Sequence, residues 1–125
     1  MHAEYDERRS HPRVEADVAA HVSRPFARHA VTIQTRNISC GGLYCRVPEY
    51  IGPSTRLHTA MIVPIRDAEG IRNELLEFDS IVVRVEPAKE EPEREAYHIA
   101  LSFVGLTVKA RALIHRYVSE RSEYE

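Results

Sequence analysis

Two short polar motifs carry the side chains best suited to chemistry. The first is Arg9-Ser10-His11-Pro12-Arg13, and the second is Asn37-Ile38-Ser39-Cys40-Gly41-Gly42. Together they supply two guanidinium groups, an amide, a hydroxyl and a glycine-lined backbone. A guanidinium presents its donors in a flat fork, which matches the O6/N7 edge of guanine or a phosphate. This set of groups suits a small, anionic guanine nucleotide.

Alternating apolar and polar residues predict the strands that position these motifs. The period of two begins directly after Arg13 and recurs in two shorter segments, the second of which follows the glycine pair. The residues expected on the apolar face of these three strands are Val14, Ala16, Val18, Ala20 and Val22, then Val31, Ile33 and Thr35, then Leu43, Cys45 and Val47. After a turn at Gly52-Pro53, a fourth strand is expected from Arg56 to Ile65.

The second half of the chain predicts two more strands. Residues 66–73 are polar and contain Gly70, which indicates a hairpin loop. The fifth strand is expected to begin near Leu75, and a change in its apolar parity predicts a bulge near Asp79-Ser80. The charged segment 87–95 indicates a solvated loop. It is followed by a sixth strand with an apolar face made by Tyr97, Ile99, Leu101 and Phe103.

A helix is expected at the end of the chain. Thr107 is a suitable N-cap. The apolar residues that follow it at helical spacing are Ala110, Leu113, Ile114, Tyr117 and Val118. Six antiparallel strands in series favour a small closed barrel, because closure removes exposed edges. The predicted fold is therefore mainly all-β, with a flexible tail (1–13), a six-stranded antiparallel β-barrel (14–106) and a C-terminal α-helix (107–121).

Length, charge and cysteine content limit the class of protein. A chain of 125 residues is expected to form one domain. Its net charge of −2 argues against a general DNA or RNA binder. No apolar stretch is long enough to span a bilayer and no signal peptide is recognisable, so we expect a cytoplasmic protein without membrane insertion. Cys40 and Cys45 suit neither a disulfide framework nor a zinc site and are expected to be free thiols.

The two motifs and the strand order resemble those of the PilZ domain family, bacterial receptors for cyclic di-GMP. The family pattern is Arg-x-x-x-Arg in the N-terminal segment and Asp/Asn-x-Ser-x-x-Gly on the barrel. Here the matching residues are Arg9 and Arg13, then Asn37, Ser39 and Gly42. The resemblance extends from about Arg8 to Tyr117 and implies a six-stranded PilZ-like barrel.

The resemblance also implies roles for the arginines. Arg9 and Arg13 would contact guanine edges and phosphates of cyclic di-GMP. Arg8 is either an auxiliary phosphate contact or a solvent-exposed side chain. The alternative for Arg9 and Arg13 is a set of exposed ion pairs with Glu15, Asp17 or Asp6, which would contribute little energy.

The second motif would complete the nucleotide site. Asn37 would accept a hydrogen bond from guanine N1–H or N2, with one acceptor where the commoner aspartate has two. Ser39 would offer its hydroxyl to the base or a phosphate, and Gly42 would let the chain turn and the ligand approach the backbone. The alternative is that Asn37, Ser39 and Gly42 serve turn formation alone.

These implications lead to a functional prediction. The chain is expected to be an effector in which cyclic di-GMP orders the N-terminal arginine segment over the barrel, and the new surface signals to an unidentified partner protein in motility or biofilm regulation. The alternative is a PilZ-shaped interaction module that binds no nucleotide, as in type IV pilus systems, although such versions typically lack these motifs. We expect no enzymatic activity, no metal site and no cofactor besides the ligand.

Overall fold

The computed structural model describes residues 13–24 and 30–122, which form seven strands and one helix. The strands are β1 (Val14–Glu15), β2 (Ala19–Ser23), β3 (Val31–Ile38), β4 (Gly42–Val47), β5 (Arg56–Asp67), β6 (Gly70–Glu86) and β7 (Tyr97–Val104), and the helix is α2 (Val108–Ser122). The predicted tail lies outside the described residues, except for Arg13.

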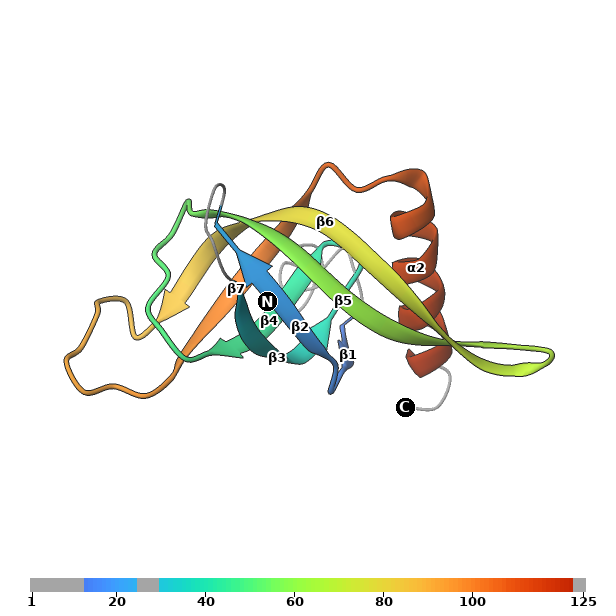
Figure 1. The fold of residues 1–125 in the computed structure, drawn as a ribbon, viewed down its shortest axis with the longest axis horizontal. Helices are drawn as coiled ribbons and strands as arrows, with labels where there is room; N and C mark the ends of the chain where they lie inside the picture. The colour runs from blue at the N-terminus through green and yellow to red at the C-terminus, as the bar shows by residue number, and fades with distance from the viewer. Residues whose placement is uncertain (1–12, 25–29, 123–125) are drawn as a thin grey trace, which may run out of the picture.

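The strands close into a barrel. They pair in the order β3, β2, β5, β6, β7 and β4, and β4 pairs with β3 again, so that six strands form a closed antiparallel ring. The short strand β1 adds to β3 outside this ring. Helix α2 stands at one end of the barrel, and the β5–β6 hairpin projects beyond it (Figure 1). The predicted barrel with its C-terminal helix is therefore confirmed, with β1 as an additional strand.

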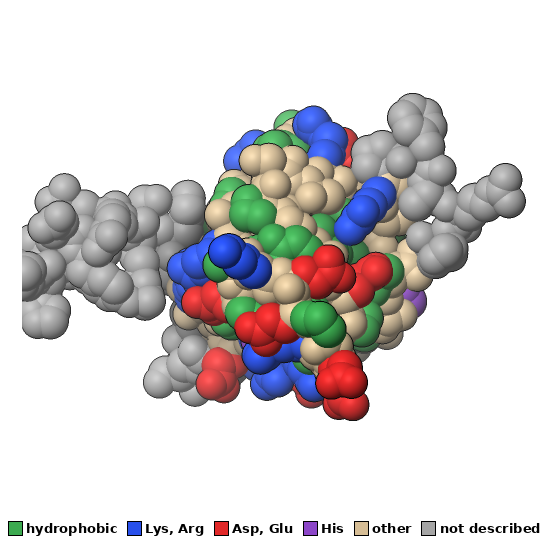
Figure 2. All heavy atoms as spheres, turned by 90° about the vertical axis from the view of Figure 1, so that its left-hand side faces the viewer, with side chains coloured by type: hydrophobic (Ala, Val, Ile, Leu, Met, Phe, Trp, Pro, Cys, Tyr) green, Lys and Arg blue, Asp and Glu red, His purple; other side chains and the backbone are tan. Residues whose placement is uncertain are grey.

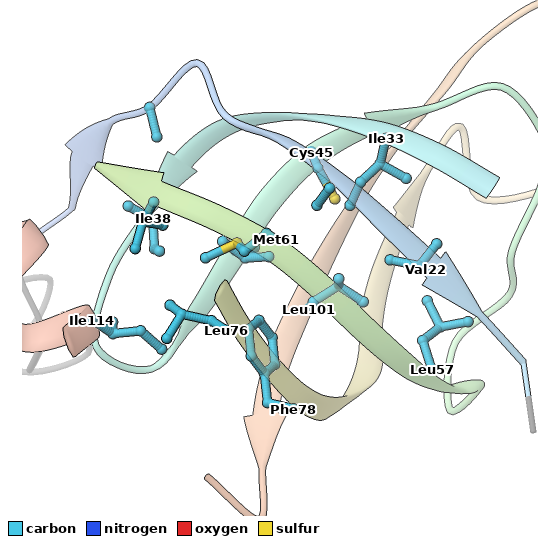
Figure 3. Packing of buried hydrophobic residues seen from close by; sticks show 14 of the residues in the cluster. Val22, Ile33, Ile38, Cys45, Leu57, Met61, Leu76, Phe78, Leu101 and Ile114 are labelled. Atoms are coloured by element: carbon cyan, nitrogen blue, oxygen red, sulfur yellow. The ribbon is translucent and has the colours of Figure 1, made fainter. Parts of the chain in front are cut away.

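The interior of the barrel is filled by the inward residues of the alternating strands. Side chains from all six barrel strands meet there, among them Val22, Ile33, Cys45, Met61, Phe78 and Leu101 (Figure 3). Burial of these apolar surfaces is the main stabilising contribution to such a fold. The helical residues predicted to face the sheet are all buried: Ala110, Leu113, Ile114, Tyr117 and Val118. The helix thus extends the core at the open end of the barrel.

Side-chain hydrogen bonds fix the ends of α2. The Thr107 hydroxyl accepts a bond of 3.0 Å from the Ala110 N–H, which confirms the predicted N-cap. Near the other end, Arg121 donates to the Glu15 carbonyl oxygen at 3.1 Å. The helix is therefore attached to the barrel at strand β1. Within the described residues, no helix combines the length and apolar character needed to cross a lipid bilayer.

The first predicted strand is divided into two. β1 and β2 both pair with β3. Three residues separate β1 from β2, whereas only two residues of β3 separate the positions that pair with them. The extra residue interrupts the ladder, although Ala16 N–H still donates to the Arg36 carbonyl oxygen at 3.0 Å. The apolar alternation continues across the break, since Ala16 is buried, and for this reason the sequence predicts one strand.

The predicted hairpin loop at 66–73 is wrong. β5 and β6 stay paired as far as Asp67 and Gly70, so Ala68 and Glu69 alone form the turn. Gly70 has a φ of 128°, a conformation that favours glycine. The polar residues that suggested a loop lie on a two-stranded arm beyond the barrel, where both strands are largely exposed.

The bulge predicted near Asp79-Ser80 is present in this strand but lies later. Ser80 is fully buried and continues the inward series of Leu76 and Phe78. The register of β6 against β7 shifts later, between Val82 and Arg84. The inward series therefore runs from Leu76 through Ser80 to Val82, and the parity changes only after it.

Candidate functional site

Strand β1 brings the two predicted motifs together. Val14 faces Ile38 and Glu15 faces Asn37 in the antiparallel register of β1 and β3. Arg13 directly precedes Val14 and is exposed, so it lies beside the corner that follows β3. Of the predicted site residues, Arg8 and Arg9 lie outside the described residues. The remaining four occupy one region of the barrel surface.

Ser39 organises the corner between β3 and β4. Its hydroxyl oxygen accepts hydrogen bonds from the N–H groups of Gly41 and Gly42 at 3.1 and 3.2 Å. Its own N–H donates to the Gly42 carbonyl oxygen at 2.9 Å. Ser39 is only 8% exposed, and its hydroxyl proton is the part of the group that remains for a ligand. Ser39 therefore stabilises the turn between β3 and β4.

Gly42 is required by the packing of β4 against β7. A Cβ at this position would lie 2.0 Å from the carbonyl oxygen of Leu101. The neighbouring Gly41 carbonyl oxygen accepts a hydrogen bond of 3.0 Å from the Phe103 N–H. The close approach of β4 to β7 therefore explains why residue 42 is a glycine. No local sequence pattern shows this approach. The predicted approach of a ligand to its backbone stays a prediction.

Arg36 adds a guanidinium that the sequence analysis did not select. The register of β3 against β4 shifts between Thr35 and Asn37, so Arg36 is an extra residue in the strand. Its side chain is exposed, while Thr35 and Ile38 on either side of the shift point into the core. Arg36 continues the outward series of Thr32 and Gln34, and the extra residue returns Ile38 to the core.

An aromatic and cationic surface adjoins the second motif. Tyr44 faces Asn37 across the β3–β4 pair. The Tyr44 ring stacks on the ring of His98 with a centroid distance of 5.7 Å, and the Arg84 guanidinium carbon lies 5.9 Å from the Tyr44 centroid. The Tyr44 hydroxyl donates to Glu86 Oε1 at 2.9 Å. These contacts hold the tyrosine ring in a fixed orientation on the barrel wall.

The electrostatic surroundings of Tyr44 are mixed. Partial burial raises the pKa of the Tyr44 hydroxyl, and the hydrogen bond and charge of Glu86 raise it further, while Arg84 and Arg36 act in the opposite direction. The phenol therefore stays protonated at neutral pH. The barrel wall beside the motif offers flat rings and guanidinium planes, which stack on purine bases, together with positive charge for phosphates.

The barrel end away from α2 mixes acidic, basic and apolar side chains (Figure 2). The charged loop 87–95 lies between β6 and β7 and is mostly exposed, as predicted. In the described part of the chain, no three His, Cys, Asp or Glu side chains are grouped so that they could hold a metal ion.

Comparison with protein families identifies the fold family. The model of the PilZ domain matches residues 7–120, a range that includes both motifs and most of α2. The chain belongs to the PilZ domain family. No curated protein matches the sequence significantly.

Solved structures with the same fold support this assignment. The Bacillus subtilis inhibitor of motility MotI (DgrA) matches with a TM-score of 0.72 and 17% identity, over 94% of this chain and 53% of that one. The PilZ domain of Escherichia coli YcgR, solved with cyclic di-GMP, matches with a TM-score of 0.64 and 12% identity, over 94% and 93% of the two chains. The present chain therefore spans about half the length of the Bacillus protein and nearly all of the YcgR domain. Identities this low show a shared fold.

Proposed function

We propose that this PilZ domain is a cytoplasmic receptor that binds cyclic di-GMP and signals to a partner protein. The nucleotide would be held by Arg9, Arg13, Asn37, Ser39 and Gly42, with Arg8 as an auxiliary phosphate contact. The observation that carries the proposal is the pairing of β1 with β3, which positions Arg13 beside the Asn37–Gly42 motif.

The chemistry of the ligand fits this region. Cyclic di-GMP has two guanine bases and two phosphates, so it needs paired donors, acceptors for N1–H and N2, and positive charge. Arg13, directly before β1, and Arg36, directly before Asn37, are both exposed and supply guanidinium groups, and the side-chain oxygen of Asn37 is an acceptor. The wall formed by Tyr44 and Arg84 is suited to stacking on a purine face. The YcgR domain, which shares this fold, was solved with the same nucleotide.

The proposed signal is the ordering of the N-terminal segment. β1 contains two residues and is connected directly to Arg13. A ligand that binds both Arg13 and the β3–β4 corner would fix the segment carrying Arg9 against the barrel, at a cost in conformational entropy that the new contacts offset. The fixed segment would form part of the surface that a partner senses. The name of the Bacillus neighbour, an inhibitor of motility, supports motility control as the process.

Calorimetric titration with cyclic di-GMP tests the proposal. We expect the wild type to bind, and Arg9→Ala and Arg13→Ala each to lower the affinity at least about thirtyfold, because each loses a charge-assisted contact worth about 2 kcal/mol. Arg111→Ala, which removes an exposed arginine from α2, is the matched control and should bind as the wild type does. Circular dichroism checks that all variants keep the fold.

Two outcomes would contradict the proposal in different ways. Unchanged affinity in both motif variants would reject the site while leaving nucleotide binding intact. A wild type that gives no binding signal would reject the receptor function and favour the alternative, a PilZ-shaped interaction module.

A further inference from the structure

The hairpin of β5 and β6 exposes an apolar surface away from the nucleotide site. Five large hydrophobic residues are exposed in the described part of the chain, and three of them lie where β5 and β6 pair with each other. They are Ile62, Leu75 and Ile71, with 54%, 59% and 64% of their surface exposed. Ile62 and Leu75 are direct cross-strand partners, so they form one continuous apolar patch.

The cross-strand register defines the whole outward surface of the hairpin. From the tip inward, its pairs are Arg66 with Ile71, Pro64 with Asn73, Ile62 with Leu75, Ala60 with Glu77, and His58 with Asp79. We call these five pairs the arm face. The hydrophobic pair stands at its centre, with two pairs on either side.

Charge is distributed unevenly along the arm face. Arg66 lies four residues from Ile62 toward the tip, and its guanidinium is on the exposed side. Four residues in the other direction, His58 Nδ1 lies 3.2 Å from Asp79 Oδ1, and both side chains are about half exposed. Glu77 is exposed between Asp79 and the central pair. One end is therefore basic and the other end is acidic.

The geometry points to a second copy of this chain as the occupant of the arm face, related by a twofold axis that crosses the strands at Ile62 and Leu75. That axis reverses the strand direction and stacks the central residues on their own copies. Pro64 then packs on the partner's Ala60, and Asn73 reaches the partner's Glu77. Arg66 lies over the partner's His58–Asp79 pair, so unlike charges meet at both ends.

The competing arrangements are less favourable. A twofold axis along the strands would bring Arg66 close to its own copy and would gather the acidic side chains of both copies at the other end. Pairing through the free edge of β5 is blocked, because Pro64 has no N–H. Helix α2 also occupies the backbone of Arg66 there, whose N–H donates to Glu120 and whose carbonyl oxygen accepts from Arg116.

The size of the arm face sets the strength of the contact. The stretch from His58 to Arg66 covers about 27 Å along a strand and is two strands wide. This is smaller than a standard stable interface, so the dimer forms reversibly as the protein concentration rises. The inference does not depend on nucleotide binding, because the arm face and the proposed ligand site share no residue.

Sedimentation equilibrium of the full chain, from micromolar to millimolar concentration, tests this interface. The wild type should pass from monomer toward dimer mass, and Leu75→Asp should remain monomeric. The matched control is Val108→Asp, which places the same charge on another exposed hydrophobic residue, at the start of α2, and should dimerise as the wild type does. A wild type that stays monomeric, or a Val108→Asp variant as impaired as Leu75→Asp, would overturn the inference.

A charge exchange tests the orientation of the two copies. Arg66→Asp and Asp79→Arg should each weaken dimerisation about tenfold, since the twofold axis repeats each repulsion. The double variant should recover most of the wild-type association. Failure of the double variant to recover, with the fold intact by circular dichroism, would reject the antiparallel dimer even if Leu75→Asp is monomeric.

Discussion

The guanidinium of Arg121 donates a hydrogen bond of 3.1 Å to the carbonyl oxygen of Glu15, which links the end of α2 to the strand that follows Arg13. Glu15 also faces Asn37 on β3. The helix therefore supports the segment that brings the two motifs together. β1 has only two residues, and this contact adds to its pairing with β3 and to the burial of Val14.

Removal of this contact should weaken the proposed ligand site indirectly. We expect Arg121→Ala to lower the affinity for cyclic di-GMP about fivefold, because a bond from a charged donor stabilises β1 by about 1 kcal/mol or more. Arg111→Ala on the same helix should have no effect. The measurement is calorimetric titration, and equal affinities for the two variants would show that β1 is held without the helix.

Gly42 should tolerate no side chain. A methyl group there would meet the Leu101 carbonyl oxygen, so Gly42→Ala must separate β4 from β7. We expect a loss of at least about 2 kcal/mol in the free energy of unfolding, measured with urea. The control is Gly52→Ala, whose Cβ would have its nearest contact at 3.4 Å, with the Tyr50 ring. Similar stability of the two variants would contradict the close strand approach.

The strand pattern explains why much of the barrel could be predicted from the sequence. Inward residues such as Ile33, Cys45 and Leu101 alternate with outward residues that are mostly polar, because each strand has one face in the core and one in water. Where both faces are exposed, as on the arm around Arg72, this alternation is lost and the segment resembles a loop. Ser80 is the opposite case. It is polar but buried inside the barrel, so the sequence does not show that the inward series continues through it.

The candidate site was predictable only in its composition. The motif residues could be named because their chemistry suits a guanine nucleotide, and their resemblance to a family pattern strengthened this. The pairing of β1 with β3 and the approach of Gly42 to Leu101 involve residues distant in sequence, which no local pattern encodes. Arg36 is outward by the alternation of its strand, but its place beside Asn37 and Tyr44 follows from the pairing of β3 with β4.

Thr59 should be replaceable by valine with a gain in stability. Its side chain is fully buried, between Val22 of β2 and Phe78 of β6, and its hydroxyl has no hydrogen-bond partner among the described residues. A buried hydroxyl without a partner costs about 1–3 kcal/mol. We expect Thr59→Val to raise the free energy of unfolding by about 1 kcal/mol in urea denaturation. Thr32→Val, at an exposed position on β3, should give no such gain.

Cys45 should make stability depend on pH in the alkaline range. Burial raises the pKa of its thiol from 9.0 to about 12. In the unfolded chain the thiol ionises above about pH 9, whereas in the barrel it keeps its proton. Between these two pKa values the folded state binds more protons than the unfolded state. The stabilising contribution of the Cys45 thiol is therefore complete below pH 9 and is lost as the pH rises from about 9 toward about 12. The free energy of unfolding should fall by up to about 1.4 kcal/mol per pH unit there.

A pair of variants isolates this thiol. Cys45→Ala should be less stable at neutral pH, because it leaves a small cavity beside Ile99, but its stability should fall less steeply above pH 9 than that of the wild type. Cys40→Ala is the control, since Cys40 is half-buried and its pKa is also raised by burial, though less strongly. Urea unfolding at several pH values gives the slopes. Parallel curves for the wild type and Cys45→Ala would show that the Cys45 thiol ionises as readily in the barrel as in the unfolded chain.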